Sequence, residues 1–169
     1  MIPLIELVPS LPPHSGKMIE QFISKRFSSS GCEKAIIGLS GGLDSALNLK
    51  LLVKELGVDS IKAFFLPYGE LSGPDEKFAR IAAEDFNIDL DVVDISPMVD
   101  SIPFETSGMV KGNLMARSRM LYLYTVANKY NGLVIGTSNK TELLMGYFTK
   151  FGDGAADIYP TGDLFKTQT

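Results

Sequence analysis

The sequence predicts an α/β fold in which an open, parallel sheet carries helices on both faces. Apolar, β-branched runs of strand length alternate with segments whose apolar residues recur at helical spacing. A glycine-rich connection, residues 40–45, joins the first of these runs to the helix that follows it. With 169 residues and 45% apolar content the chain can bury a core, and its length favours a single domain over residues 1–169.

The first half of the sequence predicts an arm, two helices and two strands. Residues 1–13 are proline-rich and are expected to form an N-terminal arm, followed by a helix that serves packing. Residues 35–39 form the first strand, the helix after the glycine-rich connection ends near Gly57, and residues 61–66 form a buried strand. The apolar positions of the two helices are Met18, Ile19, Phe22, Ile23 and Phe27, then Leu43, Ala46, Leu47, Leu51 and Leu56.

The second half predicts two more helix and strand pairs. Pro74 suits the first turn of a helix, residues 90–95 form the third strand, and a long helix over residues 112–130 leads to a fourth strand at residues 133–136. The apolar positions of the helix that begins at Pro74 are Phe78, Ile81, Ala82 and Phe86.

Charge and cysteine content exclude several classes of protein. The formal net charge is −4 and the longest basic cluster is residues 117–119, so no basic stripe for a nucleic acid is visible. The single cysteine, Cys32, cannot form an internal disulfide, and with the single histidine, His14, it cannot make a structural zinc site. No signal peptide or bilayer-length apolar run is apparent, so we expect a cytoplasmic protein without a membrane partner.

The connection Ser40-Gly41-Gly42-Leu43-Asp44-Ser45 has the pattern of a phosphate-binding turn. Two glycines allow the backbone N–H groups to approach an anion, and the N-terminus of the next helix adds about half a positive charge. Asp44 would repel an anion, so its expected role is to hold a divalent cation, Mg²⁺, that bridges to the phosphates. The alternative is a tight strand-to-helix connection with a Ser or Asp cap.

This connection resembles the S-G-G-x-D-S loop of the ATP pyrophosphatase families, which split ATP between its α and β phosphates. Residues 136–142 read Gly-Thr-Ser-Asn-Lys-Thr-Glu, and residues 146–157 read Gly-Tyr-Phe-Thr-Lys-Phe-Gly-Asp-Gly-Ala-Ala-Asp. Together, in this order, the motifs narrow the resemblance to NAD synthetase, from about Lys34 to the end of the chain. The resemblance implies a Rossmann-like fold of the adenine nucleotide alpha hydrolase type.

The resemblance also implies roles for individual residues. Asp44 and Glu142 match magnesium ligands, and Asp153 is a candidate catalytic residue. Arg117, in Gly112-Asn113-Leu114-Met115-Ala116-Arg117, matches a deamido-NAD contact, as do Lys150 and Asp157. The implied ATP contacts are Gly38, Leu39, Ser40, Gly41, Gly42, Leu43, Asp44, Ser45, Thr137 and Lys166. No residue is expected to be a covalent nucleophile, and Cys32 is read as an ordinary residue.

The implied reaction is the amidation of deamido-NAD, with ATP as co-substrate and Mg²⁺ as cofactor. A carboxylate is a poor electrophile, so it must be activated by adenylation, with pyrophosphate and then AMP leaving. Only 33 residues precede Lys34, too few for a glutamine amidase domain, so free ammonia is the expected nitrogen donor. Relatives are homodimers, which implies a second copy of this chain as partner.

Three departures from the family pattern stand out. Ser138-Asn139-Lys140 replaces an acidic residue and a histidine found in many relatives, and Phe65 stands where some carry an ATP-binding arginine. The chain ends at Thr169, where relatives continue, so the C-terminal third of the family domain is expected to be missing. The alternatives are another ATP pyrophosphatase, GMP synthetase-like or tRNA-modifying, or a catalytically silent nucleotide-binding fragment.

Overall fold

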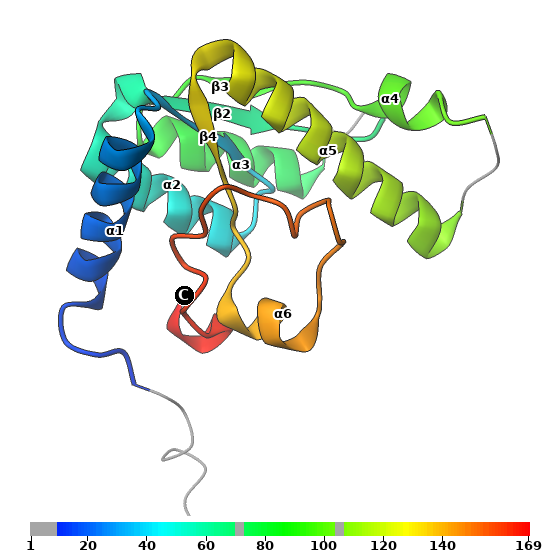
Figure 1. Ribbon diagram of the computed structural model, residues 1–169. Helices are drawn as coiled ribbons and strands as arrows, with labels where there is room; N and C mark the ends of the chain where they lie inside the picture. Colours follow the sequence, from blue (N-terminus) through cyan, green and yellow to red (C-terminus); the bar gives the residue numbers. More distant parts are fainter. Residues whose placement is uncertain (1–9, 70–72, 104–106) are drawn as a thin grey trace, which may run out of the picture.

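The computed structural model of the chain describes residues 10–69, 73–103 and 107–169 (Figure 1). Most of the predicted N-terminal arm, residues 1–9, therefore lies outside the described residues. None of the helices in the described part is both long enough and apolar enough to span a bilayer.

Four parallel strands form one sheet among the described residues. They are β1 (Lys34–Gly38), β2 (Ile61–Phe65), β3 (Leu90–Val92) and β4 (Gly132–Ile135), in the order β3-β2-β1-β4. The chain runs outward from β1 to β2 and β3 and then returns to place β4 on the other side of β1. The order therefore reverses between β1 and β4, which is the position where open α/β sheets bind ligands.

Helices connect the strands and cover the two faces of the sheet (Figure 1). The α-helices are α1 (Ser15–Ser30), α2 (Leu43–Leu56), α3 (Pro74–Asp85), α4 (Ser96–Asp100), α5 (Gly108–Tyr130) and α6 (Lys140–Met145). The described residues also include two short 3₁₀ helices, η2 (Val58–Ser60) and η3 (Lys166–Gln168). The predicted open parallel sheet with helices on both faces is confirmed.

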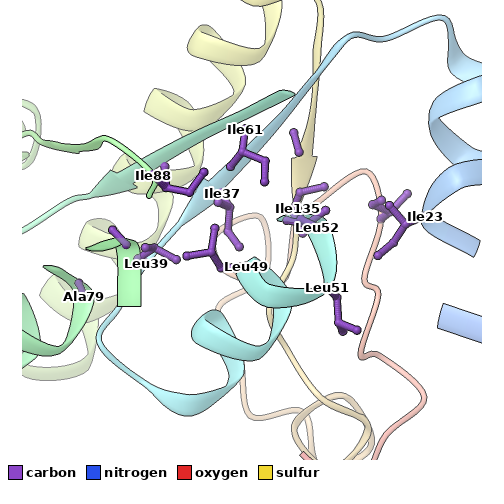
Figure 2. Close-up of a cluster of buried hydrophobic side chains, with 14 of the residues drawn as sticks. Ile23, Ile37, Leu39, Leu49, Leu51, Leu52, Ile61, Ala79, Ile88 and Ile135 are labelled. Atoms are coloured by element: carbon purple, nitrogen blue, oxygen red, sulfur yellow. The ribbon is translucent and has the colours of Figure 1, made fainter. Parts of the chain in front are cut away.

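Alternation along the strands divides the core into two layers. One cluster joins Ile37, Phe65 and Ile135 to side chains of α1, α2 and α3, among them Ile23 and Leu49 (Figure 2). The other cluster lies on the opposite face of the sheet, where strand residues pack against α4 and α5. Its strand members are Ile36, Phe64 and Val134. Successive side chains of a strand point to opposite faces, so a sheet buried on both faces needs continuous apolar strands.

The structure corrects several predicted boundaries and burial assignments. The third strand ends at Val92 instead of residue 95, and the long helix begins at Gly108 instead of residue 112. On α3 the small residues Ala79 and Ala83 are buried, whereas Phe78 is 55% exposed. Small side chains let the helix approach the sheet closely, a packing effect that helical spacing alone does not reveal. The sequence reasoning did not predict α4 or α6.

Candidate functional site

The glycine-rich connection lies at the carboxyl end of β1, where the strand order reverses. Gly41 has φ +79°, in the left-handed region that favours glycine. A Cβ there would also overlap the backbone carbonyl of Asp75, in the first turn of α3. Glycine is therefore required twice over, by the conformation of the turn and by its contact with α3.

Hydrogen bonds between the two serines hold the turn in shape. The Ser45 hydroxyl donates to Gly42 O at 2.9 Å and accepts from Ser40 N at 3.3 Å. Ser40 Oγ lies 3.3 Å from Ser45 Oγ and accepts from Gly42 N at 3.3 Å. Ser40 is exposed and Ser45 is buried, so of the two hydroxyls Ser40 has access to solvent.

Asp44, in the first turn of α2, is the centre of a polar cluster that unites three distant segments. Its Oδ2 accepts from Lys166 Nζ at 2.6 Å and from Asn139 Nδ2 at 3.2 Å. Its carboxylate is 14% exposed, against 52% for the Lys166 side chain. The structure thus brings together two residues that the resemblance assigns to phosphate chemistry, Asp44 and Lys166.

Glu142, the second implied metal ligand, belongs to a capping box at the start of α6. Its backbone N–H donates to Asn139 Oδ1, and its own Oε2 accepts from Asn139 N, both at 3.1 Å. Asn139 therefore connects Glu142 to Asp44. Sequence reasoning missed this asparagine, although the spacing of Asn139 and Glu142 is the signature of a capping box.

The donor set around Asp44 fits Mg²⁺ with phosphate as co-ligand. Asp44 Oδ1 is buried and, within the described ranges, has no hydrogen-bond partner. Those ranges contain no group of three or more His, Cys, Asp or Glu side chains that could hold a metal by themselves. Mg²⁺ is commonly held by one or two carboxylates with waters and substrate phosphates. Asp44, at the serine and glycine turn, and Glu142, joined to it through Asn139, match this preference.

A cavity of about 470 Å³ opens beside the turn, at the carboxyl ends of β1, β2 and β4. Its lining includes Gly38, Leu39, Ser40, Thr137 and Asp153 of the predicted site residues. Phe64, Phe65, Leu66 and Leu123 make much of the wall apolar. Its size and its mixture of apolar walls with a few polar groups are typical of small-molecule sites.

Arg119 lines this cavity, although the sequence analysis placed it only within the basic cluster of residues 117–119. Its Nε donates to Leu66 O at 2.8 Å. Burial lowers the pKa of Arg119, and the Asp153 carboxylate partly opposes this shift. The Arg119 guanidinium therefore lies at Leu66. The residue before it, Phe65, stands where some relatives carry an ATP-binding arginine. Residue spacing could not indicate this contact, because it joins α5 to a loop 53 residues away.

The other predicted substrate contacts lie around the segment after α6. Arg117 is exposed and donates from Nε to Lys150 O at 3.2 Å, and the exposed Lys150 lies over the Phe151 ring. Asp153 Oδ1 accepts from Thr149 N at 2.8 Å. The structure brings Arg117 and Lys150 together.

Asp157 has two internal partners in the structure. Its Oδ2 accepts from Val134 N at 2.7 Å, and its Oδ1 accepts from the Tyr124 hydroxyl at 3.3 Å. These bonds tie the segment after α6 to β4 and α5. The deamido-NAD contact predicted for Asp157 stays a prediction.

Comparisons with known proteins point to one family. A model described as NAD synthase matches residues 16–169. The NH(3)-dependent NAD(+) synthetase of Trichlorobacter lovleyi is 44% identical over 156 residues, covering 90% of this chain and 57% of that protein. That of Thermococcus kodakarensis is 41% identical over 154 residues, covering 89% and 60%. The chain therefore spans about 60% of the length of these curated relatives.

Solved structures agree in fold as well as in sequence. NH3-dependent NAD synthetase from Campylobacter jejuni superposes with a TM-score of 0.86 at 34% identity, covering 91% of this chain and 68% of that one. NMN synthetase from Francisella tularensis superposes with a TM-score of 0.85 at 39% identity, covering 95% and 68%. These neighbours confirm the Rossmann-like, adenine nucleotide alpha hydrolase type of fold and do not favour the other ATP pyrophosphatases or a silent fragment. The serine and glycine turn, the Asp44 cluster and the matched residues 16–169 together show that this chain belongs to the NAD synthase family.

Proposed function

We propose that this chain binds ATP at the Ser40–Ser45 turn and takes part in the ammonia-dependent amidation of deamido-NAD to NAD. The observation that carries the proposal is the cluster of Asp44, Asn139 and Lys166 at the start of α2. In this cluster a carboxylate and an ammonium lie at the serine and glycine turn, and the size and mixed lining of the cavity beside that turn support the proposal.

The chemistry requires charge compensation more than a nucleophilic side chain. The carboxylate of the substrate attacks the α-phosphorus of ATP, the α–β phosphoanhydride bond breaks, and pyrophosphate leaves. Ammonia then attacks the acyl carbon of the adenylate, loses a proton, and AMP leaves as the amide forms. Negative charge grows on the phosphoryl oxygens, so donors and cations aimed at them lower the barrier.

The residues divide this work by position. The N–H groups of the turn and the Ser40 hydroxyl bind phosphate, and Lys166 neutralises it. Asp44 and Glu142 would hold Mg²⁺, which when bound supplies further positive charge to the phosphoryl oxygens. The cavity lined by Phe64, Leu123 and Thr137 receives the adenosine part of ATP. Arg117, Lys150 and Asp157 contact deamido-NAD, and Asp153, which lines the cavity, is the candidate catalytic residue.

A homodimeric assembly and a cytoplasmic location are also part of the proposal. Several large apolar side chains are exposed on α5 and α6, among them Leu121 (57%), Leu144 (69%) and Met145 (76%). Surfaces of this kind mark contacts with other chains, which supports a homodimer. The sequence has a single cysteine, Cys32, which supports a location in the cytoplasm, because disulfides are rare in that compartment.

Product analysis tests the reaction. Incubated with ATP, ammonium, Mg²⁺ and deamido-NAD, the protein should form NAD, AMP and pyrophosphate in equal amounts, separable by anion exchange. Omission of deamido-NAD is the control and should abolish AMP formation. ADP and orthophosphate as main products would refute the assignment.

A second candidate substrate is the mononucleotide counterpart of deamido-NAD. The 39% identity to NMN synthetase from Francisella tularensis supports it, since that name states a mononucleotide product. The same assay with nicotinic acid mononucleotide in place of deamido-NAD distinguishes the two. A higher kcat/KM for the mononucleotide would assign the protein to NMN synthesis, with the adenylation chemistry unchanged.

A further inference from the structure

Asn139 is fully buried between the two carboxylates that the proposed function assigns to the metal. Its exposed fraction is 0%. Its Nδ2 donates to Asp44 Oδ2 at 3.2 Å, and its backbone N–H donates to Glu142 Oε2 at 3.1 Å. One residue thus holds oxygens from α2 and from α6.

The hydrogen bonds also fix which way the side-chain amide points. Asn139 Oδ1 accepts from Glu142 N, so this end of the amide must be the oxygen. The nitrogen therefore faces Asp44, where a carboxylate oxygen needs a donor. The reversed amide would place oxygen against oxygen at Asp44 and nitrogen against an N–H at Glu142.

Capping α6 does not by itself call for asparagine. Serine, threonine and aspartate cap helices about as well, because an N-cap needs only an oxygen acceptor. What asparagine adds is a second, donating end, and here that end meets Asp44. We propose that Asn139 is a positioning residue that fixes Asp44 and Glu142 relative to each other, so that both carboxylates face the same cation and phosphates. This inference rests on the proposed function.

Lys166 and Asn139 share the same oxygen of Asp44 but differ in freedom to move. The Lys166 side chain is 52% exposed, whereas Asn139 is fully buried. Lys166 can therefore leave Asp44 for a phosphate, while Asn139 stays and keeps the carboxylate oriented. Asp44 Oδ1, which is buried and has no partner among the described residues, is the oxygen left for a cation.

Two substitutions separate positioning from capping. Asn139→Ser keeps an N-cap oxygen and loses the donor to Asp44, whereas Asn139→Ala loses both. For each protein, the dissociation constant of ATP is measured by calorimetry in Mg²⁺ and in EDTA, and the ratio of the two gives the metal enhancement of binding. Thermal unfolding reports the cap.

Asn139→Ser should reduce the metal enhancement about tenfold or more, the usual cost of losing a group that orients a metal ligand. Its Tm should stay within about 2 °C of the wild type, because serine still caps the helix. Its ATP affinity in EDTA should be unchanged. Asn139→Ala should show the same reduced enhancement with a Tm lower by about 2–4 °C.

The outcomes that would overturn the inference are distinct. A wild-type enhancement that persists in Asn139→Ser would show that Asn139 serves only as a cap and would leave the proposed function standing. ATP binding without metal enhancement in the wild type would refute the metal assignment, and this inference with it. An equal loss of ATP affinity in Mg²⁺ and in EDTA would assign Asn139 to the shape of the turn instead.

Discussion

Gly41 shows at the scale of one residue how conformation and contact combine at the phosphate turn. Its φ of +79° disfavours any side chain, and a Cβ would also overlap the Asp75 carbonyl. Gly31, which ends α1, has φ +70° with no atom near the position of a Cβ. Both glycines have a left-handed backbone, but only Gly41 is in contact with Asp75. Gly31 is therefore a suitable control for Gly41.

We expect Gly31→Ala to lower the free energy of unfolding by about 1–2 kcal/mol, the cost of a left-handed alanine. Gly41→Ala should cost more, because the backbone of α3 must also move, and it should weaken ATP binding at least several-fold. Urea unfolding followed by circular dichroism and ATP titration by calorimetry measure the two effects. Equal stability losses, or ATP affinity retained in Gly41→Ala, would contradict this account.

At the scale of elements, Asp157 joins the segment after α6 to β4 and α5. Its carboxylate accepts from Val134 N on β4 and from the Tyr124 hydroxyl on α5. Burial, followed by the nearby Asp157 carboxylate, raises the pKa of Tyr124 from 10.0 to about 12. The fold therefore favours the protonated tyrosine, which can donate a hydrogen bond.

This raised pKa sets the sign of a pH effect. Because the pKa of Tyr124 is higher in the folded state, the protonated tyrosine stabilises the fold fully at pH values below its unfolded pKa of about 10. This contribution is lost as the pH rises toward about 12. The difference in unfolding free energy between wild type and Tyr124→Phe should thus shrink over this range. Urea unfolding at successive pH values measures it, with Tyr147→Phe, at an 80% exposed tyrosine, as control. A constant difference would refute the assignment.

On the scale of the whole molecule, the segment after α6 packs back against β4 and α6. Lys140 N donates to Leu164 O and Gly136 N to Ile158 O, which places this segment along β4 and α6 (Figure 1). Thr161, fully buried, accepts from Asn48 Nδ2 of α2 at 2.8 Å. This packing holds Lys166 within reach of Asp44.

Thr161→Val should lower the free energy of unfolding by about 1–3 kcal/mol, because it leaves a buried amide hydrogen of Asn48 without a partner. Thr161→Ser keeps the hydroxyl and is the control for the polar contact. Hydrogen exchange at the Gly136 and Lys140 amides should quicken in the valine variant, while the Leu39 amide, bonded to Phe64 within the central sheet, should not change. Equally faster hydrogen exchange at all three amides would show that the substitution destabilises the whole fold, and not specifically the contact between this segment and the sheet.

The sequence by itself determined the parallel α/β architecture, the serine and glycine turn between the first strand and the next helix, and the family. These features depend on local patterns: β-branched runs, helical spacing, and glycines at a strand-to-helix connection. Ser40 and Thr137, which the resemblance gave as ATP contacts, both follow strands of the parallel sheet and both line the cavity.

Only the tertiary structure decided which polar groups meet. Asp44 is joined to Lys166 across 122 residues, and to Asn139 across 95, by hydrogen bonds that no local pattern encodes. The partial burial of Arg119 at the cavity and the two hydrogen bonds of the Asp157 carboxylate likewise depend on how α5 packs on the sheet. Residue type and spacing show which chemistry a chain can perform, but burial and long-range contacts set which side chain performs it, since both arise only when distant segments pack together.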